Sequence, residues 1–357
     1  WKISRTERRY PSKNLILTEY IINQMLQKNF HDKDNWNNSL CQFTDKNIFQ
    51  TFEWGELKKL EGWEVLQITV TDNETLKCIL IAQVLIKKIL GVKIAWCPGG
   101  PLIQCDNSEN GINALDKFQE AIYEESIFNL RCKPYMKNTS KNQKLFSNIS
   151  KSKNSLTSSK SSLIKIVPET DFLKQIKKKH RYYIKQSEKS DLIWKVCSGA
   201  DTTTVFNSVY DEMKRNKSLK LPIIDINSFS KILGFDNNEN PRLFTYAGFE
   251  NNIPVSVCLI SILGDRAFYH YAASTERGRE LSASYGMIYN LIQELKRLSI
   301  NKLDFGGISS DGSSAGVDFF KLGFNGDELS KLGEFDISKS KVYSYFFNKL
   351  LQFKKNT

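Results

Sequence analysis

The sequence is poor in the residues and motifs that mark several common classes of enzyme. Its three histidines lie far apart, at positions 31, 180 and 270, which argues against a histidine-based metal site. Seven cysteines are scattered without a CxxC pair, so we expect reduced, buried thiols of a cytosolic protein. Neither a P-loop nor a GxSxG elbow is present, which removes the usual support for a kinase, hydrolase or dehydrogenase. The longest apolar run, Cys78 to Leu90, is interrupted by polar residues and falls short of a membrane span.

The chain is long, apolar enough to fold, and strongly basic. At 357 residues it exceeds one ordinary domain, so we expect two domains. Its 40% hydrophobic content is enough to build cores and excludes global disorder. The net charge of +12 indicates anionic partners such as phosphorylated substrates, nucleic acid or acidic membrane lipids.

Apolar patterns along the chain alternate between the strand period and the helix period, which predicts an α+β protein built of α/β layers. The second half repeats the element order of the first, which indicates a structural duplication. Residues 138–162 are rich in Ser, Lys and Asn, so we expect a mobile surface segment there. The expected strands are 63–70, 78–86, 92–96, 163–167, 242–249, 255–263, 267–273 and 302–305, and the expected helices are 113–128, 171–189, 203–215 and 282–298.

The segment from Leu303 to Asp327 carries the strongest candidate for a chemical site. A strand end runs into Gly306-Gly307, where the missing Cβ atoms permit a sharp bend or the close approach of a ligand. A Ser- and Gly-rich loop then leads to Phe320-Lys321, and a lysine beside an apolar wall suits an anion or a developing oxyanion. The structural alternative is a strand, a turn and a buried aromatic cluster.

Two further segments suggest anion binding. Residues 174–189 hold seven Lys or Arg against one Glu, and on a helix many of these would lie close together, which favours a phosphate ligand. Tyr182 and Tyr183 add rings that can stack on a base or sugar. The alternative is a solvated lysine face. Pro98 to Pro101 follow an apolar strand and predict either a rigid loop with exposed amides or a plain tight turn.

Taken together and in this order, these segments resemble the FemABX family of non-ribosomal peptidyl transferases, which add amino acids from aminoacyl-tRNA to peptidoglycan precursors. The resemblance implies two tandem GNAT-like acyltransferase domains, each a mixed β-sheet flanked by helices, in the short form that lacks a coiled-coil arm. We expect the first domain at 1–160 plus 326–357 and the second at 163–325. The matching positions are Phe49-Gln50-Thr51 with Trp54 and Lys58, Pro98 to Pro101, Lys179 and Arg181 with Ile184 and Lys189, the 282–298 helix, Asp304 to Ile308, Phe320-Lys321, Gly323-Phe324 and Gly333-Glu334.

The resemblance also implies roles for individual residues. Lys321 would serve the transfer step, Phe320 would line the channel, and Lys58 and Arg181 would grip the phosphates of the precursor. No metal and no cofactor is expected, because aminoacyl-tRNA is a co-substrate. The remaining pocket residues would be Trp54, Tyr183, Tyr246, Gly99, Gly100, Asp304, Gly306 and Gly307.

The implied function is transfer of an amino acid from aminoacyl-tRNA to the amine of a UDP- or lipid-linked peptidoglycan precursor, by a cytoplasmic monomer. Contact with the cytoplasmic face of the membrane is a further expectation. The family commonly has Pro-Arg-Gly-Pro where this chain has Pro98 to Pro101, which leaves the acceptor open.

Two other functions stay open. One is N-acylation of an amino sugar of a surface polysaccharide or lipopolysaccharide from acyl-CoA, although residues 279–284 match a CoA pyrophosphate loop poorly. The other is a silent RNA- or membrane-binding module. In that case residues 342–355 would rest on an anionic bilayer, instead of packing back on the first domain.

Overall fold

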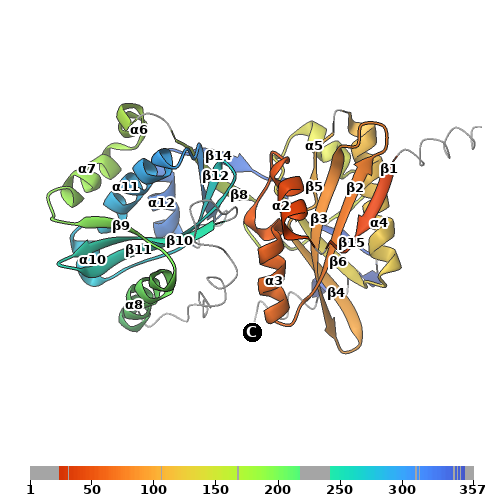
Figure 1. The fold of residues 1–357 in the computed structure, drawn as a ribbon, viewed down its shortest axis with the longest axis horizontal. Coiled ribbons are helices and arrows are strands. Elements are labelled where there is room, and N and C mark those ends of the chain that lie inside the picture. The colour runs from red at the N-terminus through yellow and green to blue at the C-terminus, as the bar shows by residue number, and fades with distance from the viewer. Residues whose placement is uncertain are drawn as a thin grey trace, which may run out of the picture.

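Two β-sheets, each covered by helices, lie beside one another in the computed structural model (Figure 1). The structure describes residues 24–30, 32–105, 107–166, 169–217, 242–309, 312, 314–340, 342–343, 345 and 347–349. Within these residues, no helix has the length and apolar character that a membrane crossing requires.

The first sheet has eight strands in the order β1-β2-β3-β4-β6-β15-β7, with β5 pairing to β3. Its strands are β1 (Gln24–Lys28), β2 (Glu64–Asp72), β3 (Cys78–Ile89), β4 (Val92–Gly99), β5 (Leu102–Ile103), β6 (Asn129–Pro134), β7 (Ser150–Lys151) and β15 (Phe335–Ile337). The helices of this part are α2 (Lys33–Cys41), the 3-10 turn η1 (Ile48–Gln50), α3 (Phe52–Leu60), α4 (Ser108–Glu124) and α5 (Ser140–Leu145).

The second sheet has seven strands in the order β14-β8-β13-β12-β11-β10-β9. These are β8 (Lys160–Lys165), β9 (Ile193–Cys197), β10 (Arg242–Glu250), β11 (Ile253–Leu263), β12 (Arg266–Ser274), β13 (Lys302–Ile308) and β14 (Asp327–Ser330). The helices are α6 (Glu169–Gln175), α7 (Lys178–Ser187), α8 (Ala200–Lys217), α10 (Glu276–Glu280), α11 (Ala283–Arg297) and α12 (Ala315–Gly323).

The two sheets have the same spatial arrangement of strands around one parallel pair, which confirms the predicted α+β fold of two tandem GNAT-like units. Each sheet is antiparallel except for one parallel pair, β4 with β6 and β12 with β13. The long helix between the two strands of each parallel pair is α4 in the first part and α11, which the short α10 precedes, in the second. Both helices are amphipathic and bury their apolar residues, such as Phe118 and Leu291, against their own sheet.

Three expectations about local structure were wrong. Residues 138–162, which were expected to be a surface segment, form α5, β7 and the start of β8, and Leu145, Phe146 and Ile149 are buried in the first core. The helix expected at 171–189 is divided into α6 and α7. The backbone N–H of Lys177 donates to Gly323 O at 2.9 Å, and not to a carbonyl of the preceding turn, so the helix is interrupted there. Strand β14 pairs with β8, so the chain returns to the first sheet after Ser330, and not at 326.

The described part of the C-terminal segment packs on the first sheet. Phe347 is buried under the guanidinium of Arg131, and Tyr343 stacks on Phe128 with 4.2 Å between ring centroids. These contacts agree with the alternative in which the segment folds back on the first domain. Residues 350–355 lie outside the described residues.

Candidate functional site

A cavity of about 440 Å³ lies between the two sheets. Its walls come from η1, α3, β3, the end of β4, the end of β6 with Tyr135 after it, the loop at 157–158, the bulged end of β13, and Lys331. The predicted residues that line it are Trp54, Lys58, Gly99, Gly306 and Gly307. Residues far apart in the sequence therefore meet here, at the junction of the two halves of the chain.

Helix α3 supplies the aromatic and cationic wall. It begins after Thr51, whose hydroxyl accepts a hydrogen bond from Trp54 N at 3.3 Å. One turn later, the ammonium of Lys58 lies 4.8 Å from the centroid of the Trp54 ring and forms an ion pair with Glu61 at 2.7 Å. The charge of Lys58 is thus offset by Glu61, which also lines the cavity.

The Pro98 to Pro101 loop is packed, not open. Its residues are buried, which corrects the expectation of exposed amides. Gln50 donates to Pro98 O at 2.8 Å and Asn47 donates to Gly99 O at 2.9 Å. A Cβ at Gly99 would overlap Asn47, and one at Gly100 would crowd Gln50 and Cys97. Only Gly99 of the two glycines lines the cavity.

Strand β13 bends sharply where it reaches the cavity. It pairs with β12 only over Lys302–Asp304, and its pairing with β8 shifts register between Asp304 and Gly307. Gly306 has a φ of +77°, a conformation that favours glycine. The buried Asp304 carboxylate fixes the bend, because it accepts a hydrogen bond from Gly306 N at 2.9 Å and another from the Tyr135 hydroxyl.

Lys321 reaches this bend from α12. Its ammonium donates to Gly307 O at 2.8 Å and lies close to Gly306, although Lys321 is not among the residues that line the cavity. Burial lowers the pKa of Lys321, and the carboxylates of Asp318 and Asp304 oppose this shift. The preceding Phe320 packs beside Phe305 and Tyr285 in the second core.

Two further lysines line the cavity and were missed by the sequence analysis. Lys331 is buried, and its ammonium lies 3.4 Å from the centroid of the Tyr135 ring. Burial lowers the pKa of Lys331 to about 8, although Asp304 nearby raises it. Lys133 donates to Ser158 O at 2.7 Å and to the Thr157 hydroxyl, and burial also lowers its pKa.

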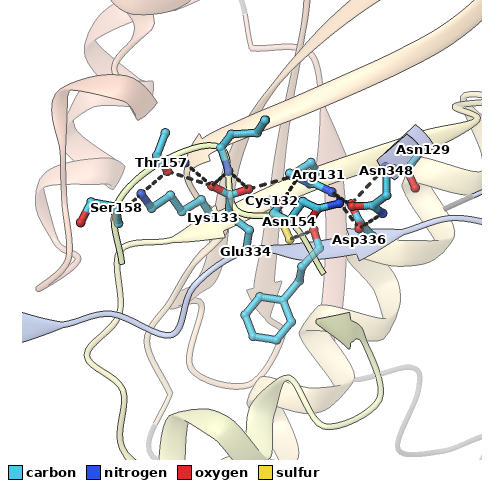
Figure 2. A network of polar contacts seen from close by, with 12 residues as sticks. Asn129, Arg131, Cys132, Lys133, Asn154, Thr157, Ser158, Glu334, Asp336 and Asn348 are labelled. Atoms are coloured by element: carbon cyan, nitrogen blue, oxygen red, sulfur yellow. Dashed lines mark hydrogen bonds and ion pairs between the residues drawn. The ribbon is translucent and has the colours of Figure 1, made fainter. Parts of the chain in front are cut away.

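A buried polar network holds the loop that these lysines contact (Figure 2). Arg131, which is fully buried, makes two hydrogen bonds of 3.0 Å to Asp336 and one of 3.4 Å to Glu334. Glu334 in turn accepts hydrogen bonds from the backbone of Leu156 and Thr157 at 3.0 Å. The C-terminal return of the chain, through Glu334, therefore fixes the loop at 157–158 and with it the hydrogen-bond partners of Lys133.

Besides Lys321, three more predicted site residues, Arg181, Tyr183 and Tyr246, belong to the second part and do not line the cavity. Arg181 donates from α7 to Lys174 O at 3.2 Å, at the end of α6. Tyr183 stacks on Tyr285 with 4.6 Å between ring centroids. Tyr246 is buried in the second core, 6.4 Å from the Trp194 ring centroid. These residues were grouped by sequence motif, and the fold does not bring them to the cavity with Lys58.

The positions of Lys133 and Tyr135 relative to the strands could have indicated that they belong to the site. Lys133 lies near the end of β6 and Tyr135 directly follows it. Because β6 runs parallel to β4, both residues reach the same edge of the sheet as Gly99. No such signal marked Lys331. It lies in a short segment between strands of two different sheets, and its backbone forms a bridge to Lys137.

The comparisons with known proteins agree with this architecture. No curated protein matches the sequence. The crystal structure of FemX superposes with a TM-score of 0.76 at 16% identity, over 90% of this chain and all of that chain. A tandem GNAT protein from the clavulanic acid biosynthesis pathway gives a TM-score of 0.51 at 8% identity, over 88% of this chain and 98% of that chain.

A protein of unknown function from Bacteroides thetaiotaomicron gives a TM-score of 0.56 at 12% identity, over 87% of this chain and 99% of that chain. The family model described as the FemAB family matches residues 32–164 and 243–352, which is most of the sequence. The match spans both sheets and every wall of the cavity. The chain is an acyltransferase with the general activity of aminoacyl transfer in peptidoglycan bridge synthesis, and it belongs to the FemAB family.

Proposed function

We propose that this protein moves an amino acid from aminoacyl-tRNA to the amine of a peptidoglycan precursor bound in the cavity between the two sheets. The observation that carries the proposal is the composition of this cavity. Lys58, Lys133 and Lys331 line it together with aromatic residues and with the bend at Gly306-Gly307 that Lys321 contacts. Cations and rings together suit an acceptor that is both phosphorylated and sugar-containing.

Lys133 and Lys331 are the proposed anion ligands within the cavity. Burial lowers the pKa of both ammonium groups, which shows that water screens them little. An anionic group that enters the cavity is therefore attracted to them more strongly than it would be to lysines on the surface. Lys58 would join them by exchanging its partner Glu61 for a phosphate oxygen. Arg181, on α7, stays a proposal for the more distant part of a long substrate.

The reaction needs little acid–base chemistry, because an aminoacyl ester is already activated. The acceptor amine, after losing a proton to solvent, attacks the ester carbonyl and forms the new C–N bond. The tetrahedral intermediate then expels the ribose 3′ oxygen, which takes up the proton that the attacking nitrogen loses as it becomes an amide. We assign the stabilisation of the oxyanion to the Lys321 ammonium, which would turn from Gly307 O to the intermediate. Positioning by the cavity supplies the rest.

The acyl-CoA alternative has less support. A CoA pyrophosphate would need free backbone amides ahead of α11. Around that helix start, the amides of Gly278, Arg279 and Ser282 donate to Thr275 and to residue 279. The side chain of Arg277 is held in ion pairs with Glu250 and Glu280.

Label transfer separates the two donors. The full chain is incubated with a UDP-linked muropeptide and either charged tRNA or acyl-CoA carrying the label. We expect label on the muropeptide from tRNA only, and its loss in Lys321→Met. Transfer from acyl-CoA alone would overturn the proposal.

A further inference from the structure

The hairpin that joins β3 and β4 ends in an exposed apolar tip. Its loop is the two residues Leu90 and Gly91, between the paired residues Ile89 and Val92. Leu90 is 98% exposed, and Ile89 and Val92 are exposed beside it. Figure 1 shows the hairpin extending beyond the other strands at the lower end of the first sheet.

A leucine at this position is unfavourable for the folded chain in water. Leu90 has a φ of +49° and Gly91 a φ of +82°, the pattern of a hairpin turn in which Asn-Gly is the favoured pair. No described residue covers the Leu90 side chain, so it gains no burial that could offset its backbone conformation. A contact outside the chain would supply that burial.

The charges around the tip indicate what it contacts. Residues 87–93 hold three lysines and no acidic residue. A depression of about 420 Å³ beside the tip is bounded by Lys88, Lys93 and Lys339, and the half-exposed Tyr343 ring lines it. An apolar point ringed by lysines and a tyrosine matches the order of hydrocarbon, interface and phosphate in an anionic bilayer.

The tip also lies on the strands that form the cavity. Leu85 and Trp96 both line the cavity and pair with each other in the same hairpin. Leu90 lies five positions beyond Leu85, which is about 17 Å along a strand. Lys87, between them, lies over the ring of Trp63, another cavity residue.

We propose that the β3–β4 tip inserts into an anionic phospholipid bilayer and holds the cavity within reach of a lipid-linked acceptor. That the acceptor is lipid-linked rests on the proposed aminoacyl transfer, whereas the binding of the tip to the bilayer does not depend on it. The bilayer would bury Leu90, Ile89 and Val92, and its phosphates would bind the lysines around them.

Sedimentation with vesicles tests the insertion. The full chain is mixed with vesicles of phosphatidylcholine, with or without phosphatidylglycerol. The test variant is Leu90→Asn, and the matched control is Leu76→Asn. Leu76 is also exposed and also has a left-handed backbone conformation. It lies in a turn at the opposite end of β3, among Asp72, Glu74 and Lys77. Asn tolerates the left-handed conformation, so both variants should fold.

We expect the wild type and Leu76→Asn to bind the anionic vesicles equally, and Leu90→Asn to bind about tenfold more weakly. Lys88→Gln should weaken binding about fivefold. Equal binding of all four proteins, or no binding of the wild type, would overturn the proposal.

A separate activity assay distinguishes this result from a failure of the proposed function. Leu90→Asn should keep wild-type transfer to a soluble UDP-linked acceptor and lose transfer to a lipid-linked acceptor in vesicles. Transfer to the lipid-linked acceptor at the wild-type rate would refute the role of the tip. If the wild type transfers an amino acid to neither acceptor, the proposed aminoacyl transfer is refuted, whereas the binding to vesicles is unaffected by that result.

Discussion

The ammonium of Lys331 lies 3.4 Å from the centroid of the Tyr135 ring, and the hydroxyl of that ring donates to the buried carboxylate of Asp304. Tyr135 follows a strand of the first sheet, and Asp304 belongs to the second. This chain of contacts therefore ties the two sheets together at the wall of the cavity. It also places the buried Lys331 at the wall of the cavity that we propose as the acceptor site.

Lys321→Met should remove most of the activity and leave the fold intact. Loss of one oxyanion donor costs about 3 kcal/mol of transition-state stabilisation, so kcat should fall about 100-fold or more, with little change in KM for the acceptor. Steady-state transfer assays measure this, with Lys185→Met on the exposed face of α7 as the control. A kcat within about threefold of the wild type would remove Lys321 from the transfer step.

Lys331→Met should weaken acceptor binding and yet stabilise the protein at pH 7. The pKa of Lys331 falls from 10.5 to about 8, so below pH 8 the folded state bears the full cost of a buried ammonium. Between pH 8 and 10.5 the unfolded state holds more protons, so the wild type becomes more stable as pH rises through this window.

The gain of Lys331→Met at pH 7 should be at most about 3 kcal/mol and should shrink toward pH 10.5. Urea unfolding across this pH range measures it. Lys137→Met is the control, because Lys137 bridges Lys331 through the backbone while its own side chain is exposed. A pH-independent difference would show that the buried charge is not the cause.

Arg131→Met should destabilise the protein by about 3–5 kcal/mol, because it leaves Asp336 and Glu334 buried without their cation. Loosening of the loop that Glu334 holds should also raise KM for the acceptor, since Thr157 and Ser158 line the cavity. Urea unfolding and transfer assays check the two effects. Arg277→Met, which breaks an exposed ion pair with Glu250, should change neither, and an equal loss in both variants would contradict this account.

Gly99→Ala should cost more stability than Gly62→Ala. Both glycines have positive φ, +72° and +79°, so both substitutions bear the backbone strain of about 1 kcal/mol. Only at Gly99 would the new Cβ overlap a neighbour, the Asn47 side chain, while Gly62 has nothing within 4 Å. Unfolding midpoints in urea give the comparison, and equal losses would mean that Asn47 moves aside freely.

The sequence by itself determined the fold class, the order of the elements and the glycine bend at the end of β13. Apolar periodicity is a local property, and it marked α4, α11 and most strands correctly because each buries one face against its own sheet. Local periodicity failed at residues 138–162, where the few apolar residues are spaced irregularly. There Leu145, Phe146 and Ile149 find their burial against strands from elsewhere in the chain.

Only the tertiary structure decided which cations share the cavity. Lys58, Lys133 and Lys331 meet because a late segment of the chain crosses back from the second sheet to the first, a long-range pairing that no local pattern encodes. The same return buries Arg131 beside Glu334 and Asp336. Burial, and not residue type, lowers the pKa of Lys331, so its chemistry exists only in the folded chain.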